Sequence, residues 1–190
     1  MKTALLIVDI QRDFCPGGAL TVSGGDQVVE PANQLLRRFE ERRLPIYLTR
    51  DWHPPNHCSF RESGGPWPPH CVVGTPGAAF HPALYVPAAA TILSKATRAD
   101  QEAYSGFDAS GLAERLNASS VDHVVVAGLA TDYCVKASVL DALAAGFRVT
   151  VLSDGIRAVD AQPGDGAKAI QEMRHCGARF AKLDDVLKQV

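Results

Sequence analysis

Apolar runs and helical periods alternate along the chain. Residues 4–10 (ALLIVDI) form a nearly continuous apolar run, which is typical of a strand covered on both faces of a parallel sheet. Residues 26–43 place apolar side chains every three or four positions, which indicates an amphipathic helix that ends before Pro45. The same patterns predict further strands over 45–49, 91–94, 123–128, 148–152 and 179–182, and helices over 110–117, 131–145, 165–176 and at the C-terminus.

Alternating strands and helices predict right-handed βαβ units, which build a doubly wound, mainly parallel sheet. We therefore expect a single-domain three-layer α/β/α fold over residues 1–190, without repeats or a linker. A chain of 190 residues can bury a full core without disulfides or a structural metal. In such sheets ligands bind outside the carboxyl ends of the strands, so the functional residues are expected there.

Residues 51–87 break this alternation. The segment is rich in proline, contains several histidines and both tryptophans, and shows no usable period. Irregular segments of this length in a compact domain are usually functional. We therefore expect part of the site to lie in it.

Composition narrows the choice of partners. A formal net charge of -2 offers no basic surface for nucleic acid or anionic lipid. The first apolar run is cut off by Asp9 and is too short for a signal peptide, and no stretch approaches the roughly 20 apolar residues that span a bilayer. The chain contains neither a dinucleotide fingerprint after its first strand nor a P-loop sequence. We expect a cytoplasmic protein without nucleic acid or membrane partners.

A cysteine opens the helix that follows the strand over 123–128. The 5 cysteines are widely spaced without a C-x-x-C pair, so neither a disulfide framework nor a zinc ribbon is expected. A thiol at a helix N-terminus feels the positive end of the helix dipole, which lowers its pKa and favours the thiolate. Cys134 is therefore a candidate nucleophile, and free N–H groups in the turn 128–134 can bind an oxyanion. The alternative is a buried structural cysteine.

Two ionisable residues lie at the ends of neighbouring strands. Asp9 ends the first strand and Lys95 follows the third. A carboxylate can accept the thiol proton and an ammonium can stabilise the thiolate, so both can form a triad with Cys134. The alternative is a structural ion pair. We do not expect a histidine base, because His123 begins its strand at the opposite edge and is predicted to lie at the surface.

A second group of ionisable residues lies in the irregular segment. Asp51 and His53 are one residue apart, which places both on the same side of an extended strand end. His70 can complete a facial set of ligands that leaves positions open for water and substrate. Mixed nitrogen and oxygen ligands favour Zn²⁺, Fe²⁺ or Mn²⁺ over Ca²⁺ or Mg²⁺. The alternative is a set of surface histidines that also includes His57.

Several segments spread over nearly the whole chain contain these residues. They read LLIVDIQRDFCPGGAL, LTRDWHPPNHCSF, WPPHCVVGTPGAAFHP, LSKAT and VVVAGLATDYCV. Together they resemble the nicotinamidase/pyrazinamidase branch of the isochorismatase-like cysteine hydrolases. The resemblance implies a nucleophile, its proton acceptor and a cationic partner, which are Cys134, Asp9 and Lys95. It also implies metal ligands, which are Asp51, His53 and His70, with His57 as a candidate fourth ligand because some relatives use a histidine in this loop.

The resemblance also implies a substrate pocket. In this family the peptide bond before the alanine of the G-x-A-T-D-x-C turn is cis, which here is the bond between Leu129 and Ala130. The N–H groups of Ala130 and Cys134 would form the oxyanion hole. Aromatic residues of the family flank a planar pyridine ring, although a plain hydrophobic-core role is the alternative here. The implied substrate-binding residues are Phe14, Trp67, Tyr104, Leu129 and Ala130.

The activity implied by the resemblance is metal-dependent hydrolysis of nicotinamide to nicotinate and ammonia through a cysteine thioester, in NAD salvage. Pyrazinamide is a second implied substrate, and a homo-oligomer is possible. Another hydrolase of the superfamily is the nearest rival, but isochorismatases lack the nucleophilic cysteine and N-carbamoyl amide hydrolases lack the Asp-x-His metal loop. A rival of a different class is a non-catalytic metal-binding α/β module. The identity of the metal and the preferred amide stay open at this point.

Overall fold

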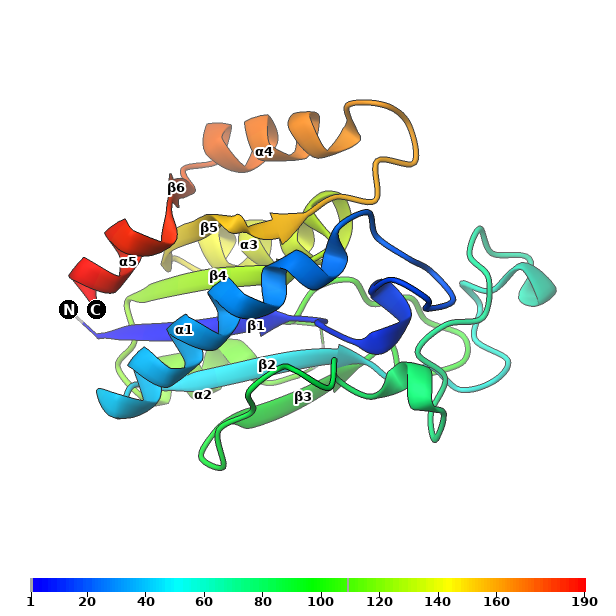
Figure 1. The fold of residues 1–190 in the computed structure, drawn as a ribbon, viewed down its shortest axis with the longest axis horizontal. Helices are drawn as coiled ribbons and strands as arrows, with labels where there is room; N and C mark the ends of the chain where they lie inside the picture. Colours follow the sequence, from blue (N-terminus) through cyan, green and yellow to red (C-terminus); the bar gives the residue numbers. More distant parts are fainter. Residues whose placement is uncertain (1, 109) are drawn as a thin grey trace.

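The computed structural model describes residues 2–108 and 110–190. Within these residues six strands form one sheet in the order β3-β2-β1-β4-β5-β6, and every neighbouring pair is parallel (Figure 1). The doubly wound arrangement is confirmed, and the described sheet is fully rather than mainly parallel. The strands are β1 (Thr3–Val8), β2 (Ile46–Asp51), β3 (Thr91–Lys95), β4 (His123–Leu129), β5 (Arg148–Arg157) and β6 (Arg179–Ala181).

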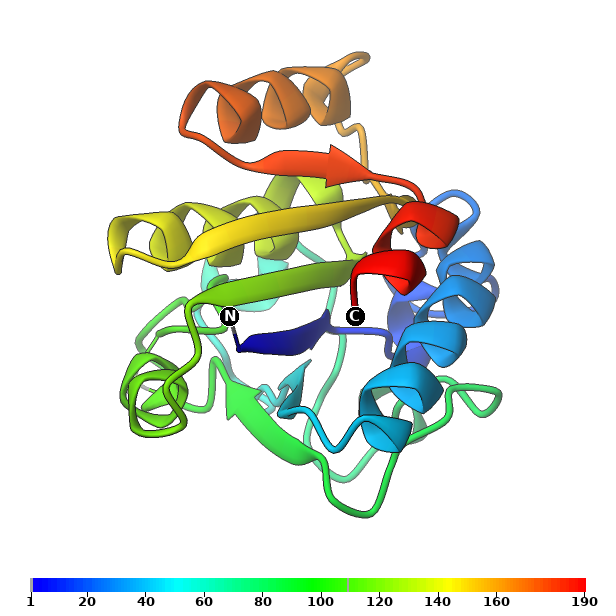
Figure 2. The same ribbon diagram turned by 90° about the vertical axis from the view of Figure 1, so that its left-hand side faces the viewer.

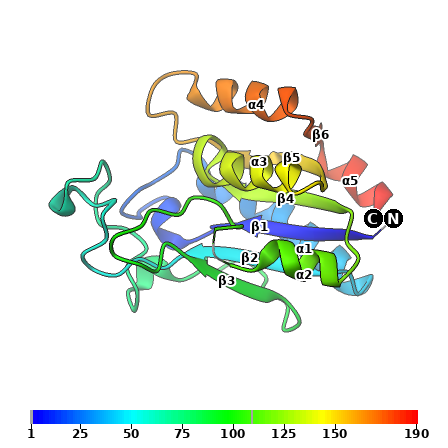
Figure 3. The ribbon, with the colours of Figure 1, turned by 180° about the vertical axis from the view of Figure 1, so that it is seen from behind.

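Helices cover both faces of the sheet, which confirms the three layers. They are α1 (Val29–Glu41), α2 (Leu112–Ala118), α3 (Lys136–Ala144), α4 (Asp165–His175) and α5 (Leu183–Gln189). α1 and α5 lie on one face, and α2, α3 and α4 on the other (Figures 2 and 3). The side chains of β1 alternate between two apolar cores, since Leu5 and Ile7 face α1 whereas Leu6 and Val8 face α2 and α3. A strand buried on both faces explains the continuous apolar run.

Two elements differ from the predicted ones, whereas the other ends agree within about three residues. The helix predicted over 131–145 is divided into a π-helical turn (Thr131–Val135) and α3. β5 continues to Arg157 because its pairing with β4 resumes after a β-bulge near Gly128. Such a bulge depends on the partner strand, so a local hydrophobic pattern does not reveal it.

His123 is buried and does not lie at the surface as predicted. Its ring nitrogens lie 3.3 Å from Thr3 Oγ1 and 2.9 Å from Thr150 Oγ1, hydroxyls that belong to the neighbouring strands β1 and β5. Its position at the amino edge of the sheet, opposite Cys134, agrees with the expectation that it is not the base.

The loops after β1, β2 and β3 gather beyond the carboxyl ends of the strands (Figure 1). Residues 52–90 contain short 3₁₀ turns, Arg61–Ser63 and Pro76–Ala78, and are otherwise irregular, as predicted. Across residues 2–108 and 110–190, the structure shows no helix that is both long and apolar enough to span a membrane.

Candidate active site

Neighbouring strands bring the predicted ionisable residues to one place. Asp9 directly follows β1, Asp51 and Lys95 are the last residues of β2 and β3, and Cys134 lies in the turn after β4. These strands are adjacent in the sheet, so their carboxyl ends converge. One carboxylate oxygen of Asp9, one of Asp51 and Sγ of Cys134 lie within 4.8 Å of one another.

The Lys95 ammonium joins these groups. Its Nζ lies 2.9 Å from Asp9 Oδ2 and 3.3 Å from Cys134 Sγ, and it also pairs with Asp51. Burial by itself would lower the pKa of Lys95, but Asp51 and Asp9 raise that pKa well above its ordinary value. Lys95 is therefore a permanent cation that contacts the thiol as well as both carboxylates, which is more than a simple ion pair.

Asp9 is fully buried and is held from two sides. Thr49 donates its hydroxyl to Oδ1 at 2.7 Å, while Oδ2 faces Lys95. Burial raises the pKa of Asp9 to about 6, although Lys95 and Thr49 act in the opposite direction. A carboxyl group with this pKa can both accept and donate a proton near neutral pH, as an acid-base residue must.

The protonation state of Cys134 differs from the expected one. The residue is buried in the π-helical turn. Burial raises the pKa of its thiol well above the ordinary value, and the Lys95 cation opposes this effect only in part. Burial therefore favours the neutral thiol at rest, in contrast to the thiolate expected from a helix N-terminus. The thiol needs a base, and the nearby Asp9 carboxylate can serve as one.

The turn that carries Cys134 begins with the expected cis peptide bond, between Leu129 and Ala130. The Ala130 carbonyl accepts the N–H groups of Tyr133 and Val135, both at 3.1 Å, which fixes the turn around the sulfur. Ala130 and Cys134 line one pocket, whereas Leu129 is fully buried in the apolar core and is absent from that lining. A direct contact of the Leu129 side chain with substrate is therefore not supported.

The pocket beside Cys134 has aromatic walls. Trp67 Nε1 donates to the Tyr104 hydroxyl at 3.1 Å, and the Trp67 ring meets the Tyr133 ring edge-on with centroids 5.1 Å apart. The cavity has a volume of about 30 Å³ and is lined by Phe14, Leu20, Asp51, Trp67, His70, Tyr104, Ala130, Tyr133, Cys134 and Val159.

Three of these lining residues were not predicted from the sequence. Tyr133 directly precedes Cys134, so its place in the same turn was a usable signal. Leu20 and Val159 come from loops without periodicity, and only the folded chain brings them to the pocket.

Asp51, His53 and His70 form a group suited to a metal ion, since one ligand atom from each lies within 4.8 Å of the others. The Nδ1 atom of His53 lies 3.0 Å from the carbonyl oxygen of His70, and Nδ1 of His70 lies 2.8 Å from that of Pro68. Carbonyl oxygens only accept, so both imidazoles donate from Nδ1 and leave Nε2 as a lone-pair donor. These contacts are typical of metal-ligating histidines.

His57 is oriented differently. Its Nδ1 lies 2.7 Å from Ser59 Oγ, and its Nε2 lies 3.1 Å from the carbonyl oxygen of Gln101. Nε2 therefore carries the hydrogen that this carbonyl accepts. A second group, His53, His57 and Glu102, has atoms within 4.8 Å of one another, but His57 does not join the group of Asp51. The structure does not favour His57 as a fourth ligand.

Gln11 is a further residue that the sequence analysis missed. Its amide donates to the carbonyl oxygens of Asp51 at 2.8 Å and Ala78 at 2.9 Å, and its Oε1 accepts the Asp51 N–H at 2.8 Å. This fully buried side chain holds the end of β2 against the irregular segment. A polar residue after a strand is common, so nothing in the sequence marked it.

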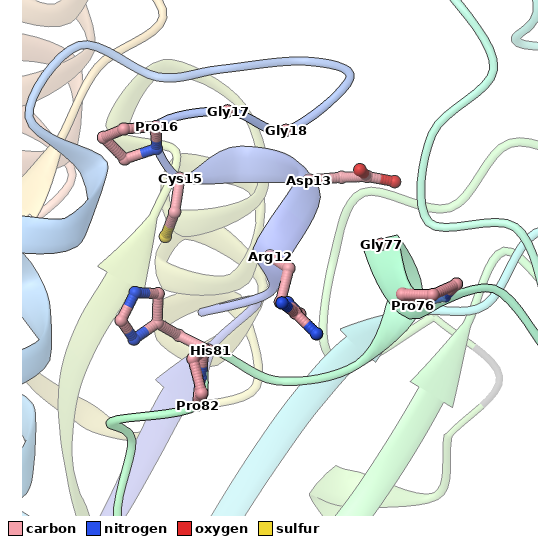
Figure 4. Close-up of a pocket in the computed structure, with 10 residues that line it drawn as sticks. All are labelled: Arg12, Asp13, Cys15, Pro16, Gly17, Gly18, Pro76, Gly77, His81 and Pro82. Atoms are coloured by element: carbon pink, nitrogen blue, oxygen red, sulfur yellow. The ribbon is translucent and has the colours of Figure 1, made fainter.

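A larger cavity of about 390 Å³ lies between residues 12–18 and residues 76–82, and its lining includes none of Asp9, Lys95 and Cys134 (Figure 4). Its potential nucleophile is Cys15, whose pKa is raised to about 11 by burial and by Asp26. The pKa of Cys134 is raised as well, but Cys134 has the Lys95 ammonium 3.3 Å from its sulfur and the Asp9 carboxylate nearby, and neither Asp9 nor Lys95 lines the cavity of Cys15. The reactive groups therefore identify the smaller pocket at Cys134 as the candidate active site.

Comparisons with known proteins identify the family to which the chain belongs. A nicotinamidase of Escherichia coli (strain K12) is 40% identical over 203 residues, which cover 96% of this chain and 95% of that protein. The crystal structure of the pyrazinamidase of Pyrococcus horikoshii in complex with zinc has a TM-score of 0.91 and 48% identity, over 96% of this chain and 99% of that one. PnC1 from L. infantum, in complex with nicotinate, has a TM-score of 0.89 and 36% identity, over 95% and 92%. The isochorismatase domain model matches residues 3–185, and the chain belongs to this family.

Proposed function

We propose that this chain is a metal-dependent cysteine amidohydrolase that converts nicotinamide to nicotinate and ammonia, a step of NAD salvage, and that it also accepts pyrazinamide. The observation that carries the proposal is the meeting of a thiol, a buried Lys–Asp pair and a metal-type ligand group at one aromatic-walled pocket. The nicotinamidase, pyrazinamidase and nicotinate-bound relatives support this choice of substrate.

In the first half-reaction Asp9 accepts the proton of the Cys134 thiol. The Lys95 ammonium, 3.3 Å from Sγ, stabilises the thiolate as it forms. The sulfur attacks the carboxamide carbon, and we assign the N–H groups of Ala130 and Cys134 as donors to the developing oxyanion. Asp9 returns its proton to the amide nitrogen, the C–N bond breaks, ammonia leaves and a thioester remains.

The second half-reaction uses the same base. Asp9 accepts a proton from the water that attacks the thioester carbon, and the C–S bond breaks to release the acid. The sulfur regains a proton and returns to the thiol that its raised pKa favours. A carboxyl group with a pKa of about 6 suits this repeated exchange.

Asp51, His53 and His70 are assigned as ligands of one divalent transition metal, Zn²⁺, Fe²⁺ or Mn²⁺. When bound there, such an ion would supply a Lewis acid. The Asp51 carboxylate has two oxygens, so it can pair with Lys95 through Oδ1 and still present Oδ2 to an ion. The walls at Phe14 and Trp67 then confine a flat ring against this group.

The test is ammonia release from nicotinamide by the purified chain, together with metal analysis. We expect turnover by the wild type and a loss of at least about 10³-fold in Cys134→Ala, as is usual when a nucleophile is removed. Cys176→Ala is the matched control, because the Cys176 thiol is exposed and lies at the C-terminal end of α4, outside the pocket. Turnover of an N-carbamoyl amide in place of nicotinamide would favour the rival hydrolase, and no ammonia from metal-loaded protein would favour the non-catalytic module.

A further inference from the structure

We propose that Asp13 is a positioning residue that orients the candidate metal ligand His53 through the peptide unit between His70 and Cys71. Asp13 lies in the 3₁₀ turn Arg12–Phe14, on a different segment of the chain from His53 and His70. The inference rests on the metal site of the proposed function, and it assigns that site a carboxylate that contacts none of the ligand side chains directly.

The peptide unit between His70 and Cys71 is hydrogen-bonded at both ends. Its N–H group, from Cys71, donates to Asp13 Oδ2 at 2.7 Å. Its carbonyl group, from His70, accepts the Nδ1 hydrogen of His53 at 3.0 Å. A peptide unit is planar, so fixing the N–H direction also fixes the carbonyl direction. Asp13, the peptide and the His53 ring thus form one relay that ends at His53 Nε2.

This relay resembles the carboxylate–histidine contacts that support metal ligands, with a peptide inserted between the two groups. A hydrogen bond to a carboxylate is stronger than one between neutral groups and polarises the donor. The His70 carbonyl thereby becomes a better acceptor for the Nδ1 hydrogen, which holds one tautomer and one ring orientation. Cys71 has a φ of +46°, a conformation that residues other than glycine rarely adopt. The hydrogen bond from its N–H group to Asp13 helps to hold the backbone in this conformation.

Asp13 is itself held in place by its surroundings. Its Oδ1 accepts the N–H of Ala19 at 3.1 Å. A Cβ atom at Gly77 would lie 2.1 Å from Oδ2, so a side chain at this position would displace the carboxylate. Figure 4 shows Asp13 extending from its turn toward the segment of Gly77. The contact at Gly77 therefore offers a second way to disturb the relay without changing Asp13.

The experiment measures zinc affinity of the zinc-loaded full chain by competition with a chromogenic chelator. Asp13→Ala removes the relay, and Gly77→Ala should push the carboxylate out of place, so both are expected to weaken zinc binding by about 10- to 100-fold. Asp13→Asn should lose less, because its one acceptor oxygen can still serve one of the two N–H groups. Asp154→Ala is the control, since Asp154 also accepts a distant backbone N–H, that of Leu183 at 3.1 Å, but lies on β5.

A second readout separates positioning of His53 from general loosening of the fold. Imidazole nitrogen NMR should show one tautomer of His53 in the wild type and in Asp154→Ala, and a mixture in Asp13→Ala and Gly77→Ala. Wild-type zinc affinity in Asp13→Ala, or an equal loss in Asp154→Ala, would overturn the inference. If Asp13→Ala fails to fold, Gly77→Ala decides the inference by the same two measurements.

Zinc affinity and ammonia release are measured separately, so the two proposals can fail separately. A wild type that binds zinc but releases no ammonia from nicotinamide refutes the proposed function and leaves the role of Asp13 to the zinc measurements. A wild type that binds no zinc overturns the inference about Asp13, whatever its activity.

Discussion

Lys95 sits among groups that exchange protons or charge in the proposed reaction. Its ammonium pairs with Asp9 and Asp51, contacts the Cys134 sulfur and donates to the carbonyl of Ala103 at 3.3 Å. Without this cation, two carboxylates would be buried close together, and a buried unpaired charge is strongly unfavourable. We therefore expect this one side chain to serve both the stability of the fold and the proposed chemistry.

The pH dependence of activity should report Asp9. Its carboxylate must be ionised to accept the thiol proton, and its pKa is raised to about 6 by burial. As the pH falls through this value Asp9 becomes protonated, so kcat/KM for nicotinamide should fall by about tenfold per pH unit below it. Initial rates of ammonia release across this range test the prediction, with thermal unfolding at each pH as the control for intact protein. A kcat/KM that stays constant through this range would contradict the role of Asp9.

Replacing Lys95 by methionine should impair both folding stability and turnover. Removing one partner of a buried ion pair costs about 3–5 kcal/mol of unfolding free energy. Loss of the group that stabilises the thiolate should lower kcat by at least about 10²-fold. Denaturant unfolding and steady-state kinetics measure the two effects. Lys136→Met is the control, because its pair with Glu172 is partly exposed and should be worth less than about 1 kcal/mol. Near-wild-type kcat in Lys95→Met would show a purely structural pair.

The pocket is assembled by loops that follow different strands. Phe14 follows β1, Trp67 lies in the irregular segment after β2, Tyr104 follows β3 and Tyr133 follows β4. The hydrogen bond between Trp67 and Tyr104 joins two of these loops across the pocket. At the element scale, the rigid sheet sets where the loops begin, and side-chain contacts between the loops set the shape of the cavity.

Tyr104→Phe tests this link between loops. The change removes the acceptor of the Trp67 indole N–H, and a lost hydrogen bond of this kind is worth about 0.5–1.5 kcal/mol. We expect KM for nicotinamide to rise by about 2- to 13-fold, with a smaller change in kcat, because the wall is less ordered before substrate binds. Tyr85→Phe is the control, since its hydroxyl bonds Glu40 outside the pocket. An unchanged KM in Tyr104→Phe would show that the bond does not shape the site.

The two apolar cores on either side of the sheet contain none of Asp51, His53 and His70. They are formed mainly by the strands, by α1 and α5 on one face and by α2, α3 and α4 on the other. Asp51, His53 and His70 lie at the loop edge of the sheet. At the scale of the whole molecule, the fold should therefore survive the loss of an ion that the chemistry requires.

Metal removal separates these two roles. Chelation should abolish ammonia release, while thermal unfolding shifts by only a few degrees because the core is unchanged. Restoring Zn²⁺, Mn²⁺ or Fe²⁺ should recover activity to different extents, since each ion differs in Lewis acidity. His53→Ala should mimic chelation, whereas His57→Ala should retain metal, because its ring nitrogens bond Ser59 and Gln101. Global unfolding on chelation, or full activity without stoichiometric metal, would contradict this view.

Patterns along the chain were enough to predict the element types, their order and a candidate chemistry. Hydrophobic periodicity is a local property, so it identified the buried strands and the amphipathic helices before any contact was known. The motifs around Asp9, Lys95 and Cys134 predicted a catalytic triad, and the parallel topology placed these residues at one edge of the sheet. The Asp-x-His spacing indicated a metal site. The distances between the candidate ligand atoms of Asp51, His53 and His70 could be measured only in the folded structure.

Other properties depend on which distant segments of the chain come into contact, so only the folded structure reveals them. Burial and the nearby carboxylates of Asp9 and Asp51 raise the pKa of Cys134, although its place in a helical turn predicted a lowered pKa. Thr49, Gln11 and Asp13 gain their roles from partners on other segments, and His123 is buried because neighbouring strands supply its hydroxyl contacts. Solvation and long-range hydrogen bonds are properties of the assembled environment, so a pattern of residue types along the chain does not contain them.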